Sequence, residues 1–142
     1  MSEGKRAFAI LKLLLEYSNK KCPILIDQPE DSLDNRAIYN ELVAYIKEKK
    51  KDRQIIIVTH NANLVVNADS EQIIIANQHG SESKNSNNVK FSYKFGSLEN
   101  TDKDINGYFL DKKNIKEHIC EILEGGEEAF KKRNDRYLII RS

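Results

Sequence analysis

Two short apolar runs constrain the fold of this chain more than any other feature of its sequence. Residues 24–27 read ILID and residues 54–59 read QIIIVT, and neither run alternates apolar with polar residues. Such runs are typical of strands covered on both faces, as in the parallel sheet of an α/β protein. Since ligands of these sheets bind where the strands end, the polar residues that follow each run are the candidate site.

Helical patterns flank these strands. Residues 4–19 place apolar side chains at helical spacing, which predicts a largely buried helix that Pro23 ends. Asp34 is a suitable N-cap for a second helix that extends to about residue 50. Two strands joined by a helix form a βαβ unit. A short helix or loop over residues 62–68 then leads to a third predicted strand, residues 72–76.

The sequence changes character after this third strand. Residues 79–88 (HGSESKNSNN) contain no apolar residue and predict a mobile loop. Residues 89–95 (VKFSYKF) alternate and predict a half-exposed antiparallel edge strand, whose aromatic side chains we expect on the core side rather than stacked on nucleic-acid bases. A final helix is expected over residues 114–123, with a break at Gly125 and Gly126 before a basic segment.

Length and composition exclude several classes of protein. The 142 residues suit a single domain, with a motif-bearing core (1–79), the loop (80–88) and a C-terminal part (89–142). Lys and Arg (23) nearly balance Asp and Glu (22), which argues against a wholly basic nucleic-acid binder. The sequence has two cysteines outside any metal-ligand spacing and no apolar run long enough for a membrane span. We therefore expect a cytoplasmic protein that does not bind membranes.

The residues themselves indicate a phosphate-binding site. Asp27 ends the first strand, and Thr59 and His60 end the second, so Asp27 and His60 should lie side by side at one sheet edge. The segment MSEGKRA places small residues at the start of a helix, where free N–H groups and the helix dipole favour anions. A carboxylate, an imidazole and a helix N-terminus together suggest phosphate and Mg²⁺.

The order of the motifs resembles the carboxy-terminal half of an ABC-type ATPase. MSEGKRA resembles the signature motif, ILIDQP the Walker B segment, DSLD the D-loop, and IIIVTHN the strand of the switch histidine. These motifs are similar to those of chromosome-maintenance (SMC) and DNA-repair cassettes and of uncharacterised AAA family ATPases. The segments GSLEN and LEGGEEAFKKR also resemble the ends of those uncharacterised ATPases. The resemblance implies a partial P-loop NTPase fold, with mainly parallel strands flanked by helices and a C-terminal edge strand and helices.

The resemblance also implies roles for matched residues. Asp27 would hold Mg²⁺, usually through water, and His60 would sense the γ-phosphate of ATP. Ser2, Gly4 and Lys5 would bind ATP held by a partner subunit. Asp34 would communicate across the dimer. The plain structural alternatives are that Asp34 is only an N-cap, Ser2 only a chain terminus, and His60 only a satisfied histidine at a strand end.

Two departures from the family pattern limit this inference. The sequence contains no GxxxxGK[ST], so we expect the chain to be the second lobe of a cassette whose Walker A half lies upstream, and to be inactive alone. Gln28 stands where the family usually has the glutamate that polarises the attacking water. Either hydrolysis is impaired or the base has moved to Glu30 or Asp31, and we favour Glu30 because Pro29 fixes a turn that can return it to the strand end.

The resemblance therefore implies that this chain is half of a Mg-ATP-dependent ATPase. Its expected partners are a Walker A-bearing half, of the same or a second subunit, and a second copy in a homodimer. DNA or RNA, and a role in repair, nucleic-acid processing or defence, follow from family analogy alone. Two other functions stay open: a non-catalytic dimerisation or docking module, and an unrelated Mg²⁺-dependent phosphohydrolase that uses Asp27, Glu30 and Asp31 directly.

Overall fold

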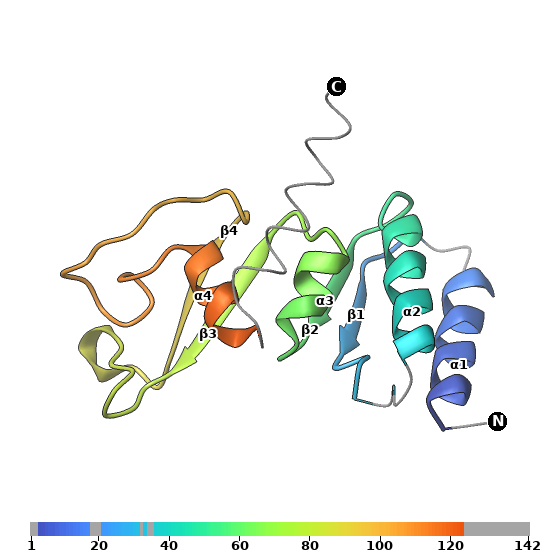
Figure 1. Cartoon of the computed structure of the whole chain (residues 1–142), viewed down its shortest axis with the longest axis horizontal. Coiled ribbons are helices and arrows are strands. Elements are labelled where there is room, and N and C mark those ends of the chain that lie inside the picture. Colours follow the sequence, from blue (N-terminus) through green and yellow to red (C-terminus); the bar gives the residue numbers. More distant parts are fainter. Residues whose placement is uncertain (1–2, 18–20, 32, 34–35, 124–142) are drawn as a thin grey trace. The chain divides into compact units, whose positions relative to one another are not determined.

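The computed structural model describes residues 3–17, 21–31, 33 and 36–123 (Figure 1). The chain divides into two compact units, one up to Asp69 and one from Ser70 onward. Among the described residues, no helix is long and apolar enough to cross a membrane.

The first unit contains the elements predicted from the two apolar runs. Its helices and strands are α1 (Glu3–Tyr17), β1 (Ile24–Asp27), α2 (Arg36–Lys49), β2 (Ile55–Val58) and α3 (Ala62–Asn67). The Asn61 side chain caps α3 by accepting a hydrogen bond from the backbone N–H of Asn63 at 3.0 Å. The proposed N-cap of α2, Asp34, lies outside the described residues.

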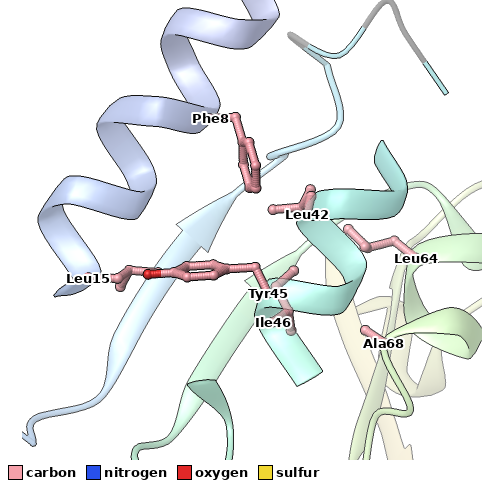
Figure 2. Packing of buried hydrophobic residues seen from close by; sticks show 7 residues of the cluster. All are labelled: Phe8, Leu15, Leu42, Tyr45, Ile46, Leu64 and Ala68. Atoms are coloured by element: carbon pink, nitrogen blue, oxygen red, sulfur yellow. The ribbon is translucent and has the colours of Figure 1, made fainter. Parts of the chain in front are cut away.

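The core of the first unit lies between its helices (Figure 2). Phe8 and Leu15 are seven residues apart and therefore share one face of α1. The Phe8 ring meets the Tyr45 ring edge to face, with the centroids 6.1 Å apart. The other buried members are Leu42, Ile46, Leu64 and Ala68. The prediction that α1 is largely buried was wrong, because Leu14 is 66% exposed and α1 packs through one face only.

The strands β1 and β2 pair in parallel, with Asp27 opposite Val58. Exposure alternates along β1, where Ile26 is 8% exposed and Leu25 is 69% exposed. The prediction of strands covered on both faces was therefore wrong for the described residues. One face contributes to the helical core, and the other leaves Leu25, Ile56 and Val58 at the surface. The residues of this second face are nevertheless apolar, as in a sheet buried on both sides.

The second unit is built on an antiparallel pair, β3 (Ile73–Gln78) and β4 (Phe91–Gly96). The third predicted strand is present as β3, and the predicted antiparallel edge strand is present as β4. Parallel pairing is limited to β1 and β2 among the described strands, so the expectation of a mainly parallel sheet holds for one of two small sheets. The short 3-10 helix η1 (Ser86–Asn88) precedes β4, and α4 (Ile115–Ile122) packs against both β3 and β4.

The two faces of β4 are reversed relative to our prediction. Phe91, Tyr93 and Phe95 are 49%, 63% and 70% exposed, whereas Ser92 and Lys94 are half-buried. The polar side chains turn inward because that side offers partners. The Lys94 amine donates hydrogen bonds to the carbonyl oxygens of Asp102 and Lys113, at 2.9 and 2.8 Å.

The segment predicted as a mobile loop, residues 79–88, has internal order that its composition did not indicate. Asn85 is 2% exposed, and its side-chain oxygen accepts hydrogen bonds from Asn77 Nδ2 and Ser92 Oγ, both at 2.7 Å. Its amide nitrogen donates to the carbonyl oxygen of Val89 at 3.0 Å. His79, predicted to be only a loop residue, accepts the backbone N–H of Asn85 at Nδ1. One buried amide therefore connects this loop to β3 and β4.

The predicted last helix is confirmed as α4. The Asn114 side chain accepts the backbone N–H of Glu117, and the Glu117 carboxylate accepts the backbone N–H of Asn114, which forms a capping box. Ile115 and Ile119 are buried on one face of α4. The predicted break at Gly125 and Gly126, and the basic segment after it, lie outside the described residues.

Candidate functional site

The candidate site lies at the carboxyl ends of β1 and β2. Because the strands are parallel and adjacent, both ends reach the same edge of the sheet. The backbone N–H of Gln28 donates to the carbonyl oxygen of Val58 at 2.8 Å, which continues the pairing one residue beyond β1. Asp27, at the last position of β1, has an exposed side chain. The edge therefore collects Asp27 and Gln28 from one strand, and Thr59 and His60 from the other.

Gln28 contacts His60 directly. The side-chain nitrogen Nε2 of Gln28 lies 3.1 Å from Nδ1 of His60, although the two residues are 32 positions apart in the sequence. Gln28 has a φ of 44°, in the left-handed region that residues other than glycine seldom occupy. That conformation costs about 1–2 kcal/mol. Backbone strain of this kind is concentrated at functional sites, where the rest of the structure holds it in place.

Glu30 returns to the same edge through the turn that we predicted at Pro29. The backbone N–H of Asp31 donates to the carbonyl oxygen of Gln28 at 3.2 Å, and that of Leu33 donates to the carbonyl oxygen of Glu30 at 2.9 Å. The Thr59 hydroxyl donates to Oε1 of Glu30. The same hydroxyl oxygen accepts the backbone N–H of Asn61 at 2.9 Å. Thr59 is therefore the residue that joins Glu30 to the end of β2.

The Glu30 carboxylate is buried, and one of its oxygens has no partner. Its side chain is 7% exposed, and Oε2 makes no hydrogen bond among the described residues. A buried carboxylate oxygen without a donor is uncommon, because the missing hydrogen bond carries a desolvation cost of about 1–3 kcal/mol. The Oε2 atom therefore retains the capacity to accept a proton or a hydrogen bond.

A tyrosine that the sequence analysis did not single out lies near this carboxylate. Burial raises the pKa of Tyr39, and the negative charge of Glu30 raises it further. Tyr39 is on α2, three and seven residues before the buried Leu42 and Ile46. That spacing marks a polar group on the buried face of the helix, and it is the sequence signal that could have found this residue.

Three side chains of the edge converge closely enough to share a cation. One ligand atom each from Glu30, Asp31 and His60 lies within 4.8 Å of the others. His60 Nδ1 is 3.9 Å from Oε1 of Glu30, and Nε2 is 3.8 Å from Oδ1 of Asp31. Oxygen ligands alone suit Mg²⁺, whereas a mixed imidazole and carboxylate set suits transition metals. The set of Glu30, Asp31 and His60 includes an imidazole and therefore suits a transition-metal ion better than Mg²⁺, whereas the exposed carboxylate of Asp27 offers an oxygen ligand at the same edge of the sheet.

The structure describes only some of the remaining predicted site residues. Ser2 and Asp34 lie outside the described residues. Gly4 and Lys5 lie in the first turn of α1, where the Lys5 residue is exposed. The structure thus brings together Gln28, Glu30 and His60, with Asp27 at the same edge, and places Gly4 and Lys5 in the first turn of α1.

Part of this chain is similar to a solved structure. No protein-family model matches the sequence, and no curated protein matches it. A solved structure from work on the structural biochemistry of ATP-driven dimerization and DNA-stimulated activation of SMC ATPases is similar, with 25% sequence identity and a TM-score of 0.49. The match covers 68% of this chain and 53% of that chain. The matched part of this chain spans about half the length of that chain.

Proposed function

We propose that this chain is the carboxy-terminal half of an ABC-type ATPase and contributes one wall of a Mg-ATP site. The observation that carries the proposal is the convergence of Gln28, Glu30 and His60 at the edge where β1 and β2 end. The Walker B-like and switch-like motifs stand 32 residues apart in sequence, yet Gln28 and His60 are within hydrogen-bond distance. The order of the four motifs in the sequence supports the same function.

Each residue of the edge has a role in this proposal. Asp27 would hold Mg²⁺, which neutralises charge on the phosphates of ATP when it is bound. Glu30 is the general base: burial keeps its carboxylate away from bulk water, and Oε2 has no donor among the described residues. His60 donates a hydrogen bond to the γ-phosphate. Gln28 cannot accept a proton as a carboxylate does, so the base is assigned to Glu30.

Other parts of the active assembly come from partners. A Walker A-bearing half supplies the backbone amides and the lysine that hold the β- and γ-phosphates. In a homodimer, Ser2, Gly4 and Lys5 meet the nucleotide of the opposite subunit, and Asp34 communicates between the two sites. Helix N-termini bind such anions through their free N–H groups. The only support for binding to DNA or RNA is the analogy with the family.

The base assignment is tested in the protein completed by its Walker A-bearing half. Replacing the base removes the proton acceptor but keeps the shape of the side chain, so Glu30→Gln should lower kcat by about 10²- to 10⁴-fold while ATP binding is retained. Asp31→Asn is the matched control, since Asp31 is the other carboxylate of the turn and is exposed. Unchanged turnover in Glu30→Gln would refute the role of Glu30, and loss of turnover in Asp31→Asn alone would transfer it to Asp31.

A second candidate function is favoured by the convergence of Glu30, Asp31 and His60 within 4.8 Å. With Asp27, these residues can act as the metal site of a self-sufficient, divalent-cation-dependent phosphohydrolase. Calorimetry with Mg-ATP on the isolated chain separates the two functions. The half-cassette lacks a phosphate-binding loop and should show no micromolar binding, whereas micromolar binding by the isolated chain would favour the self-sufficient enzyme.

A further inference from the structure

We propose that Gln28 is a positioning residue that fixes the tautomer of His60, with the ring proton on Nε2. The proposal starts from the contact between the Gln28 side-chain nitrogen and Nδ1 of His60, at 3.1 Å. What the tautomer does for ATP rests on the proposed function. The hydrogen bond and the tautomer do not depend on it.

The donor and acceptor chemistry of the two groups determines where the proton lies. The amide nitrogen of glutamine can only donate, so Nδ1 of a neutral His60 must accept. The remaining ring proton is then on Nε2. Glu30 does not compete for Nδ1, because its Oε1 atom is 3.9 Å away and already accepts the hydroxyl of Thr59. Gln28 is therefore the partner of Nδ1 that sets the tautomer.

The backbone of Gln28 supports a positioning role independently. Its N–H group still pairs with the carbonyl oxygen of Val58, at 2.8 Å, as an extended strand residue would. Its φ of 44° departs from the extended conformation. An extended residue at this position would direct its side chain to the face opposite that of Asp27. The left-handed conformation redirects the side chain, and the result is the contact with His60 from the neighbouring strand.

An amide at position 28 leaves a neutral His60 with a hydrogen-bond donor at Nε2. With Nδ1 occupied by the amide, Nε2–H of a neutral imidazole is a donor, and it lies on the side of the ring where Asp31 Oδ1 is 3.8 Å away. A donor in this position suits an anionic oxygen such as that of a phosphate. A glutamate at position 28 would instead accept from Nδ1–H, so Nε2 of a neutral ring would carry no proton, and only a doubly protonated His60 would be a donor there.

Nitrogen-15 NMR of the histidine rings in the intact chain tests the tautomer. Spectra recorded at roughly pH 9, well above the ordinary histidine pKa of about 6.5, report neutral rings. We expect wild-type His60 to show a protonated Nε2 and an unprotonated, hydrogen-bonded Nδ1. Gln28→Glu should move the proton to Nδ1. Gln28→Leu should remove the hydrogen bond and shift the Nδ1 resonance toward that of a solvent-exposed ring.

The chain supplies matched controls. Gln54→Leu changes the same residue type at the opposite end of the β1–β2 pair, and it should leave the His60 ring unchanged. His79 and His118 are internal references, because His79 Nδ1 accepts from Asn85 and His118 Nε2 donates to the carbonyl oxygen of Leu110 at 3.0 Å. Unchanged backbone amide spectra away from the edge establish that each variant is folded.

Three results would overturn the proposal. The first is a ring proton on Nδ1 of His60 in the wild-type chain, and the second is an unchanged tautomer in Gln28→Glu. The third is that the nitrogen chemical shifts of His60 in Gln28→Leu equal those of the wild type. In the completed ATPase, Gln28→Leu should raise KM for Mg-ATP about 2- to 10-fold, as expected for one lost neutral hydrogen bond. If the spectra give the expected tautomer and no ATP is bound or hydrolysed by the completed protein, only the proposed function fails.

Discussion

The two small sheets of this chain place their polar groups in opposite ways. In the β1–β2 pair, the polar side chains follow the strands and gather at one edge, where Gln28, Glu30 and His60 meet. In the β3–β4 pair, the polar side chains lie inside and hydrogen-bond to one another around Asn85, while the aromatic residues of β4 face outward. Among the described residues, the first pattern leaves an oxygen of the Glu30 carboxylate without a hydrogen-bond partner, and the second satisfies its buried polar side chains internally.

This difference is the reason that we propose the chemical site in the first unit. A satisfied polar network stabilises and specifies a fold, whereas a buried carboxylate oxygen without a hydrogen-bond donor is typical of a site that acts on a ligand. We therefore propose a structural role for Asn85 and a chemical role for Glu30. The following predictions test whether the two units depend on their buried groups in these different ways.

The largest expected effect on stability is in the apolar core of the first unit. Leu42 is 1% exposed, and Leu42→Ala should leave a cavity and lower the free energy of unfolding of that unit by about 4 kcal/mol. Hydrogen exchange of the backbone amides in each unit measures this loss separately. The control is Leu25→Ala, because Leu25 is 69% exposed and should cost little. Equal losses in the two variants would contradict the assigned core.

A smaller effect is expected from the buried amide of the second unit. Asn85→Leu removes the partners of Asn77, Ser92 and the Val89 carbonyl oxygen, and should lower the free energy of unfolding of the second unit by about 3 kcal/mol. Hydrogen exchange of the β3 and β4 amides is again the measurement. Ser81→Ala, at an exposed position of the same loop, is the control. Unchanged exchange in Asn85→Leu would show that the network does not stabilise the unit.

The smallest effect is a pH dependence at the start of α4. A hydrogen bond from the Lys103 amine, at 2.8 Å, and one from the backbone N–H of Asn114 lower the pKa of Glu117. Because the folded-state pKa is below the unfolded one, this stabilisation is present above the unfolded pKa and is lost as pH falls through the folded pKa.

Glu117→Gln keeps the capping box but removes the charge. The stability difference between wild type and Glu117→Gln, measured by hydrogen exchange in α4, should therefore shrink as the pH is lowered from roughly 6 to roughly 3. A difference that stays constant over this range would mean that the charge of Glu117 does not contribute.

Local patterns predicted the elements well, because each of them is set by neighbouring residues. The two apolar runs became β1 and β2, Pro29 made the turn that returns Glu30, and the helix predicted over residues 114–123 is present as α4. The parallel pairing of β1 and β2 also followed from the intervening helix. These features need only spacing and backbone chemistry.

What the sequence did not predict depends on partners distant in the sequence. The alternation of polar and aromatic residues in β4 is equally compatible with either face pointing inward. The polar face points inward because the Lys94 amine finds hydrogen-bond acceptors there, the carbonyl oxygens of Asp102 and Lys113. The contact between Gln28 and His60 depends on a positive φ that no residue preference indicates for glutamine. Tyr39 was overlooked because its hydroxyl lies on an otherwise apolar helix face.

The central claim is that the edge of the β1–β2 sheet meets the phosphates of ATP. The most direct measurement is a map of backbone amide chemical shifts in the protein completed by its Walker A-bearing half, with Mg-ATP added to the Glu30→Gln variant so that turnover is blocked. The account predicts shifts at the amides of Gln28 and His60, and none at Asn85 or Ser92. The claim would be contradicted if bound nucleotide changed the amide chemical shifts of Asn85 and Ser92 and left those of Gln28 and His60 unchanged.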